Sequence, residues 1–270
     1  MSLSRILALG TVAYHPYSLD DALRGASAAG YAHVEVFTGA GEGHHLSTGM
    51  DDAAVEAVLR KLDRHGLKVS GLNANIGLMT EERAETTKRA LSLAKKLGAE
   101  IITNTIAGPD SHEEDLDRFM AQIGGIADHA EEVGVTLAIE VHGDQTGSGK
   151  LIAPVIQRVD HHRVKINYDT ANCVYYGDAW PYEDLQLAIR DLAQIHLKDK
   201  VGGKGVWNFP PAGSGDVDFK RVLDILDEGG FQGPMSVEIE FDEKGWPAVE
   251  GVHEAAASAR RHLLGLLESS

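Results

Sequence analysis

Short apolar runs of β type alternate with longer amphipathic runs from one end of the chain to the other. Several helical runs end in a glycine just before the next strand, among them Gly98 and Gly134. Eight such units in 270 residues, without a break in composition, predict one domain, 1–270, folded as a closed (β/α)₈ TIM barrel. A doubly wound open sheet stays an alternative, because alternation does not prove closure. The predicted strands are 5–11, 32–37, 68–74, 99–105, 135–141, 163–169, 192–198 and 234–241, and the predicted helices lie near 18–29, 50–65, 80–97, 112–133, 149–159, 181–190, 217–229 and 247–267.

Composition limits the partners of the chain. Lys and Arg number 25 against 41 Asp and Glu, which gives a formal net charge of −16. Such an acidic chain is unsuited to nucleic-acid phosphates and to anionic membrane surfaces, and no stretch has the apolar length of a membrane span. The single cysteine, Cys173, excludes an internal disulfide and fits a reducing compartment. We therefore expect a cytoplasmic protein with no nucleic-acid or membrane partner.

Four side chains of metal-binding type each lie near the end of a different predicted strand. They are Glu140 in LAIEVHGD, Asp169 in VKINYDTAN, His196 in AQIHLKDK and Glu238 in MSVEIEF. In each of these strands alternate residues form an apolar face and a polar face, and the candidate ligand is on the polar one. The apolar faces must pack on the outer helices, so the polar faces are expected inside the barrel. Their carboxyl ends are where barrel enzymes place their chemistry.

The ligand chemistry of this set favours one divalent cation. Three carboxylates and one imidazole suit Mn²⁺ foremost, and Mg²⁺, Co²⁺ or Zn²⁺ as well, better than copper or an iron–sulfur centre. Taken singly, a strand-end carboxylate more often caps a helix or forms an ion pair, and a lone strand histidine is usually a packing residue. Four such residues on consecutive strands, all with the same facing, favour a metal site. Glu240 is a weaker alternative to Glu238 as the fourth ligand.

The motifs around these residues resemble those of a known family. The segments IEVHGDQTG, INYDTANCVYYGD, IHLKDK, GSGDVDF and GPMSVEIE are similar to the sugar phosphate isomerase/epimerase-like group of xylose-isomerase-like TIM barrels. The resemblance covers nearly the whole chain and is strongest from about residue 135 to 241. The superfamily includes ketose 3-epimerases, hydroxypyruvate isomerase, inosose dehydratase and apurinic endonuclease IV. In its epimerase-like members the matching Glu, Asp, His and Glu bind one divalent cation, which implies the ligands Glu140, Asp169, His196 and Glu238.

The resemblance also implies a reaction. Proton loss next to a ketone requires stabilisation of an enediolate, which a divalent cation supplies as a Lewis acid. Epimerisation needs groups on both faces of the substrate, and the resemblance gives these acid and base roles to Glu140 and Glu238. We therefore expect a metal-dependent sugar isomerase or epimerase acting on a ketose or keto-sugar.

Three other functions are weighed beside this one. The runner-up is a lyase or dehydratase that uses the same site on a keto-inositol or 3-keto-glycoside. A barrel that binds a sugar or a protein without catalysis is the third, although it has no need of two opposed carboxylates. An apurinic endonuclease is disfavoured by the acidic charge and by Asn172, which stands where that branch has a histidine.

Candidate substrate contacts follow from strand facing. His142 and Lys198 lie two residues beyond a ligand on the inward face, so we expect them at the rim, where either can bind a sugar hydroxyl or orient a ligand carboxylate. For Lys198 a solvated rim charge is an equal alternative. Glu35 matches a strand-end glutamate common in the family, and is expected to contact substrate or to form an ion pair across the rim.

The loop at about 200–216, VGGKGVWNFPPAGSGD, is rich in Gly and Pro yet carries aromatic residues. Connections of this length usually have a function, so a lid or substrate wall is expected, with Lys204 and Trp207 in contact with substrate. The alternative is an ordered loop that packs on a neighbouring subunit. Relatives are often dimers or tetramers, and the sequence leaves the oligomeric state open.

Overall fold

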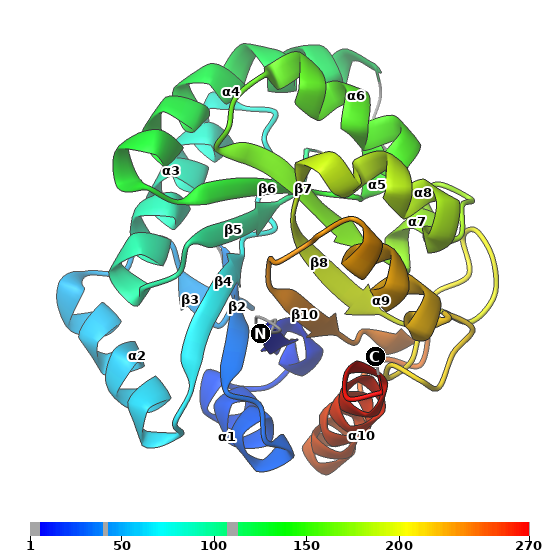
Figure 1. Ribbon diagram of the computed structural model, residues 1–270. Helices are drawn as coiled ribbons and strands as arrows, with labels where there is room; N and C mark the ends of the chain where they lie inside the picture. Colours follow the sequence, from blue (N-terminus) through cyan, green and yellow to red (C-terminus); the bar gives the residue numbers. More distant parts are fainter. Residues whose placement is uncertain (1–5, 40–42, 107–112, 270) are drawn as a thin grey trace.

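Eight parallel strands close into a barrel in the computed structural model, which describes residues 6–39, 43–106 and 113–269. Closure is shown by β1, which pairs with β10 through Leu9 and Val237 and with β2 through Leu9 and Val34. The predicted (β/α)₈ barrel is therefore confirmed and the open sheet is excluded (Figure 1). The barrel strands are β1 (Leu7–Gly10), β2 (His33–Gly39), β4 (Lys68–Asn73), β5 (Ile101–Asn104), β6 (Thr136–Glu140), β7 (Val164–Asp169), β8 (Leu192–Lys198) and β10 (Met235–Glu238).

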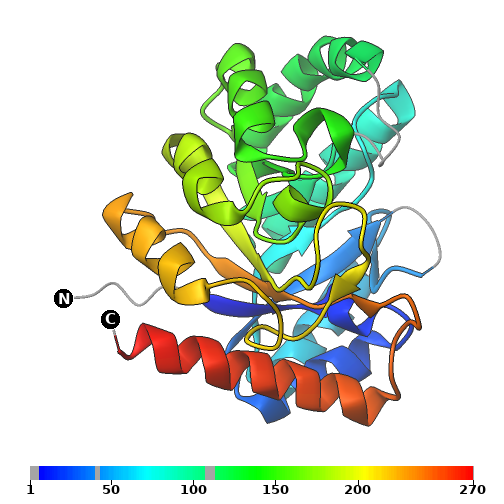
Figure 2. The ribbon, with the colours of Figure 1, turned by 90° about the vertical axis from the view of Figure 1, so that its right-hand side faces the viewer.

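Helices surround the barrel, and α10 lies along one side of it (Figure 2). The last helix, α10, packs against the first, α1. Two tyrosines that flank α1 also reach α10: Tyr31 donates a hydrogen bond to the carbonyl of Ala256, and the Tyr14 hydroxyl forms a hydrogen bond with Nδ1 of His253. This contact closes the outer ring of helices. The helices are α1 (Leu19–Ala29), α2 (Asp52–Arg64), α3 (Glu81–Leu97), α4 (Glu113–Val133), α5 (Gly143–Thr146), α6 (Gly149–Val159), α7 (Asn172–Tyr175), α8 (Pro181–Ala188), α9 (Phe219–Glu228) and α10 (Val249–Leu267), with 3₁₀ turns η1 (Thr11–Tyr14) and η2 (Ile189–Asp191).

Local sequence sets the ends of these helices. Ser18 begins α1 with a capping box that it forms with Asp21, and Thr80 caps α3. Gly30 and Gly98 end the same two helices with φ of 87° and 78°, a backbone region that glycine enters without steric cost. These two glycines, which the sequence places just before a strand, therefore end helices in the structure.

Residues of the barrel strands face as the sequence predicts. Leu137 and Ile139 of β6 are fully buried in the apolar layer between strands and helices, and Glu140 belongs to the opposite, inward face. Polar side chains also fill the barrel interior, including Thr103 and Gln194, both without exposed surface. None of the described helices is long and apolar enough to cross a membrane.

Three short strands were not expected. β3 (Leu46–Ser47) extends the sheet beside β2, whereas β9 (Asn208–Phe209) and β11 (Phe241–Asp242) form a separate antiparallel pair. The antiparallel pair of β9 and β11 joins the loop after β8 to the segment after β10. Because both segments leave the carboxyl ends of barrel strands, this pair belongs to the face where the predicted ligands lie.

A buried carboxylate joins two helices to the barrel. Asp184 of α8 accepts hydrogen bonds from the backbone amides of Gly149 and Lys150, at 2.5 and 3.0 Å, where α6 begins. The same carboxylate accepts a hydrogen bond of 2.8 Å from the hydroxyl of Tyr168 on β7. Without the acid, the Gly149 amide and the Tyr168 hydroxyl would be buried without an acceptor, so Asp184 fixes the place of α6 and α8 on β7.

Replacing Asp184 with Ala is expected to lower the free energy of unfolding by about 3 kcal/mol, because two buried donors and one part-buried donor lose their acceptor. Guanidinium denaturation at constant pH measures the change. The matched control is Asp224→Ala, since Asp224 is half-exposed and forms an ion pair with the exposed Lys220 on the same helix, α9. Its loss is expected to cost less than about 1 kcal/mol. Equal losses in the two variants would contradict the role given to Asp184.

Candidate metal centre

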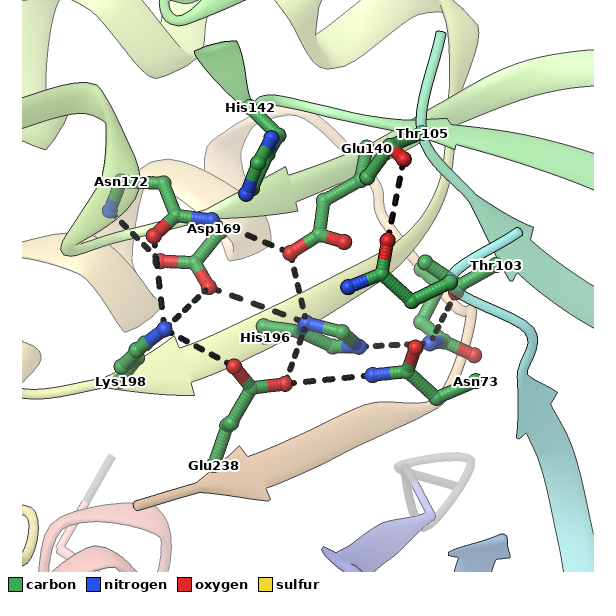
Figure 3. Close-up of polar contacts among 12 residues, drawn as sticks. Asn73, Thr103, Thr105, Glu140, His142, Asp169, Asn172, His196, Lys198 and Glu238 are labelled. Carbon is green, nitrogen blue, oxygen red and sulfur yellow. Dashed lines mark hydrogen bonds and ion pairs between the residues drawn. The ribbon is translucent and has the colours of Figure 1, made fainter. Parts of the chain in front are cut away.

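The four predicted ligands meet at the carboxyl ends of four neighbouring strands. Glu140, Asp169, His196 and Glu238 come from β6, β7, β8 and β10, and one ligand atom of each lies within 4.8 Å of the others. All four side chains are buried. Figure 3 shows the three carboxylates turned toward the imidazole of His196. The structure therefore brings together the set that the sequence singled out.

The distances describe a compact group around one imidazole nitrogen. Nδ1 of His196 lies 3.1 Å from Oε2 of Glu238, 3.4 Å from Oε1 of Glu140 and 3.8 Å from Oδ2 of Asp169. Three carboxylates this close repel one another unless positive charge lies among them. A divalent cation is the charge that such a donor set is suited to hold.

Two atoms of the group support this fit. Within the described chain, neither Nδ1 of His196 nor Oδ2 of Asp169 makes a hydrogen bond, although both are buried. Buried polar atoms are rarely left without a partner. Both atoms face the common centre of the four side chains, where one divalent ion would be a partner for each. The residues present therefore fit one metal ion.

Backbone amides hold Asp169 in place. Its Oδ1 accepts hydrogen bonds from the amides of Ala171 and Asn172, both at 2.8 Å, in the turn after β7. Because this oxygen is fully engaged, the other one is directed at the centre. Asn172 also donates its side-chain amide to Oε1 of Glu140 at 3.1 Å, so one turn orients two of the four candidate ligands.

Glu35 lies beneath the imidazole and not at the rim. Its Oε2 is 3.0 Å from Nε2 of His196, and its Oε1 accepts a bond of 2.6 Å from Gln194 and one of 3.2 Å from Thr103. The side chain has no exposed surface. The expected substrate contact at the rim is corrected here, and the expected ion pair of Glu35 is formed with His196 in the interior and not across the rim. The carboxylate holds Nε2 and leaves Nδ1 toward the centre.

Lys198 is buried among carboxylates, which corrects the alternative of a solvated rim charge. Its ammonium is 2.9 Å from Oε1 of Glu238, forms a closer ion pair with Glu240, and lies 3.8 Å from Oδ2 of Asp169. The ring of Phe209 on β9 lies against it, with 4.5 Å between Nζ and the ring centroid. Burial alone would lower the pKa of Lys198, but these acids raise it well above its usual value.

The two proposed acid/base residues differ in electrostatic environment. Burial raises the pKa of Glu140 to about 7, despite the opposing effect of His196. Burial would also raise the pKa of Glu238, but Lys198 and His196 outweigh it and hold that pKa well below its usual range. For His196 itself, the carboxylates of Glu35 and Glu238 overcome burial and raise the pKa well above the ordinary value. The two glutamates are thus unequal before any cation binds.

A small cavity of about 50 Å³ opens beside the candidate ligands. His142, Trp207 and Lys198, which the sequence predicts to contact substrate, are among the residues that line it. Lys204 is exposed and is not part of the lining, so the predicted contact of this residue is not supported by its place. The volume is well below the roughly 300–1,000 Å³ of ordinary ligand pockets, so a whole sugar requires lining side chains to move.

Several residues that line the cavity were not among the predicted site residues. Tyr176 bonds Nε2 of His142 at 3.0 Å, and Asn73 donates to Oε2 of Glu238 at 3.4 Å. Asn75 and Phe37 complete this side of the cavity. Asn73 could have been found as a polar strand-end residue on β4, whereas Tyr176 lies in the segment after β7 and gives no periodic signal.

Two charged residues pin the loop that carries Trp207. Asp199 is fully buried and accepts backbone amides from Gly213 and Gly215 at 2.8 Å each and from Val217 at 3.1 Å. The adjacent Lys200 donates its ammonium to two carbonyls inside the same loop. A side chain at Gly215 would collide with the Asp199 carboxylate, so only glycine fits there. Through Trp207 the loop forms part of the cavity wall.

A larger cavity, of about 530 Å³, lies at the opposite end of the barrel. It is lined by residues at the amino ends of β2 and β4, such as His33 and Lys68, and by apolar side chains that include Leu59. Among the described residues, only the group at the carboxyl ends brings metal-type ligands together. Chemistry and not volume therefore identifies the functional end.

Comparison with known proteins identifies the family to which this barrel belongs. The family model for xylose isomerase-like TIM barrels matches residues 23–262. The chain belongs to this family. A solved xylose isomerase-like TIM barrel protein from Mycobacterium smegmatis, in complex with magnesium, superposes with a TM-score of 0.79 at 17% identity, covering 98% of this chain and 97% of that one. At this identity the superposition supports the shared fold alone.

Two curated relatives of this xylose isomerase-like barrel are enzymes with different reactions. The inosose dehydratase of Geobacillus thermodenitrificans is 28% identical over 216 residues, which is 68% of this chain and 70% of that protein. The L-ribulose-5-phosphate 3-epimerase UlaE of Salmonella typhi is 27% identical over 180 residues, or 62% and 59% of the two chains. One relative is a lyase by name and the other an epimerase, so relationship alone indicates an enzyme without choosing the reaction.

We expect the purified protein to bind one equivalent of Mn²⁺ or Co²⁺ per chain, and His196→Ala to lose that ion, because the imidazole is the only nitrogen donor of the set. Metal analysis after dialysis measures the content. His162→Ala is the matched control, since that side chain is 67% exposed. Retention of one tightly bound equivalent by the His196 variant would exclude this centre.

Glu35→Gln keeps the size of the side chain but removes the charge beneath His196, so metal affinity is expected to fall by about 10- to 100-fold. Titration of the metal-free protein with Co²⁺, followed by its visible absorption, reports affinity and ligand geometry together. Glu56→Gln on the exposed face of α2 is the control. Unchanged affinity and spectrum would remove the orienting role of Glu35.

Proposed function

We propose that this protein is a divalent-metal-dependent sugar isomerase or epimerase that acts on a ketose or keto-sugar. The proposal rests on one observation, the arrangement of Glu140 and Glu238 around His196. Their strands, β6 and β10, are separated in the barrel by β7 and β8, so the two carboxylates reach the centre from different sides. A substrate held between them would present one face to each.

The chemistry follows from this placement. A divalent cation, with Mn²⁺ as the first candidate, would be held by Glu140, Asp169, His196 and Glu238 and would polarise the substrate carbonyl as a Lewis acid. One glutamate takes the proton from the carbon next to the carbonyl, and the other returns a proton to the opposite face. Burial of both carboxylates in a narrow cavity strengthens their interaction with the reacting atoms.

The surrounding residues have supporting roles in this proposal. Lys198 forms ion pairs with Glu238 and Glu240. His142 offers a hydrogen-bonding ring to sugar hydroxyls, and Trp207 offers an aromatic surface to the C–H groups of a sugar. The expected partner is a small-molecule sugar, with neither nucleic acid nor membrane. A cytoplasmic location is expected for such an enzyme, and either a dimer or a tetramer is compatible with it.

A lyase or dehydratase is the second candidate, and the relationship to an inosose dehydratase favours it. The first step is shared, because proton loss next to a carbonyl precedes both reactions. The difference lies in the next step, in which a leaving group departs from the neighbouring carbon in place of reprotonation. Keto-inositols and 3-keto-glycosides are the substrates expected for that outcome.

Incubation of the Mn²⁺-loaded protein in D₂O with ketoses, keto-inositols and 3-keto-glycosides tests the proposal by NMR. Deuterium at the carbon next to the carbonyl together with an epimeric or isomeric product supports it. An unsaturated or shortened product supports the lyase. The absence of exchange with every compound, in protein shown to hold the metal, would reject both reactions.

Glu140→Gln and Glu238→Gln are each expected to lower kcat by about 10²- to 10⁴-fold, because each removes one proton-transferring group. The metal content of each variant is measured in parallel, so that a lost ion is not mistaken for lost acid/base chemistry. Glu254→Gln on exposed α10 serves as the control. Near-normal turnover of both site variants with metal bound would contradict the assigned roles.

A further inference from the structure

The wall of the cavity beside the candidate ligands is acidic or neutral. Glu140, Glu238 and Glu240 contribute three carboxylates, and Lys198 is the only lysine or arginine among its described lining residues. The remaining polar lining consists of groups without a fixed positive charge, such as the amides of Asn73 and Asn75, the Tyr176 hydroxyl and the His142 ring. This is an environment for hydroxyl groups and not for anions.

The ammonium of Lys198 already forms ion pairs within the protein. This ammonium contacts Glu238 at 2.9 Å and pairs with Glu240, and only 2% of the residue is exposed. Its charge is therefore compensated by carboxylates before a substrate arrives. A phosphate would have to displace one of those acids from Lys198 and leave that carboxylate without its cation, close to the added negative charge, which is costly.

The charges around the centre also disfavour an anionic substrate. The carboxylates of Glu35, Glu140, Asp169, Glu238 and Glu240 lie within this one cluster. They outnumber the positive charges that Lys198 and one divalent cation supply when the ligating imidazole is neutral. The potential in the cavity thus stays negative in the loaded protein, and the net charge of the whole chain, −16, has the same sign.

Apart from Lys198, none of the described lysines and arginines lines the cavity. Lys204, in the loop that forms one wall, is exposed and outside the lining. By sequence, the segments 40–42 and 107–112, which follow β2 and β5, contain neither lysine nor arginine.

From these observations we propose that the site selects uncharged ketoses and keto-sugars and discriminates against their phosphate esters. The inference rests on the proposed function and narrows its substrate class. The selecting groups are the carboxylates at the cavity, above all Glu240, whose side chain is 20% exposed and is therefore the acid of the Lys198 pair most open to an incoming ligand.

Matched substrate pairs test this proposal. D-Ribulose and D-ribulose 5-phosphate, and D-fructose and D-fructose 6-phosphate, are compared with the Mn²⁺-loaded protein in D₂O. The expected result is a kcat/KM at least about 100-fold higher for the free sugar of a pair, a size typical of like-charge rejection. A phosphate ester that reacts as well as its free sugar, or better, overturns the proposal.

Binding separates this test from the test of the reaction itself. Calorimetric titration of the same four compounds into the Mn²⁺-loaded protein ranks them even where none is turned over. Tighter binding of the free sugars supports the inference, and tighter binding of the esters overturns it. Lack of turnover with every compound counts against the proposed function, whereas the ranking by binding decides the substrate class.

A charge variant then locates the selectivity. Glu240→Gln is expected to reduce the preference for the free sugar by about 10-fold, because one carboxylate beside the cavity is lost. Glu250→Gln, exposed on α10, is the control and is expected to keep the full preference. An unchanged preference in the Glu240 variant would show that this carboxylate does not select the substrate.

Discussion

Electrostatic repulsion among buried carboxylates is the constraint on which the centre depends. Glu35, Glu140, Asp169 and Glu238 are all buried within one short stretch of the barrel interior. Such charges are stable only when positive partners lie among them. Lys198 is one of these partners, and two buried atoms without hydrogen bonds, Nδ1 of His196 and Oδ2 of Asp169, mark the place where a metal ion would be the second. The orientation of the other site residues follows from this balance.

The barrel makes that balance possible by the way its strands are filled. Apolar side chains on one face of each strand pack on the helices, and the polar side chains on the other face gather inside. Rigid connections then hold the functional end: Asp184 fixes α6 and α8 on β7, and Asp199 fixes the loop that carries Trp207. Both are buried carboxylates that are satisfied by backbone amides, so they add order without adding uncompensated charge to the centre.

Membership of the xylose isomerase-like family fixes the scaffold and leaves the reaction open, since curated relatives include a dehydratase and an epimerase. The features that distinguish one chemistry from another lie in the cavity. Here they are the opposed pair Glu140 and Glu238, the compensated Lys198 and the Glu240 carboxylate beside it. These side chains, and not the fold, carry the proposals on reaction and substrate.

The sequence alone determined the order of strands and helices, favoured a closed barrel, and singled out the four residues that meet at the carboxyl ends of its strands. It could do so because strand residues alternate between two faces, which gives the facing of Glu140, Asp169, His196 and Glu238 directly. Only the tertiary structure decided how deep each inward residue lies, because depth depends on the register between tilted strands. Glu35 therefore lies beneath His196 and not at the rim, and Lys198 lies among acids and not in water. Loop positions such as Lys204 and Tyr176 have no periodicity at all, so their places were settled by packing.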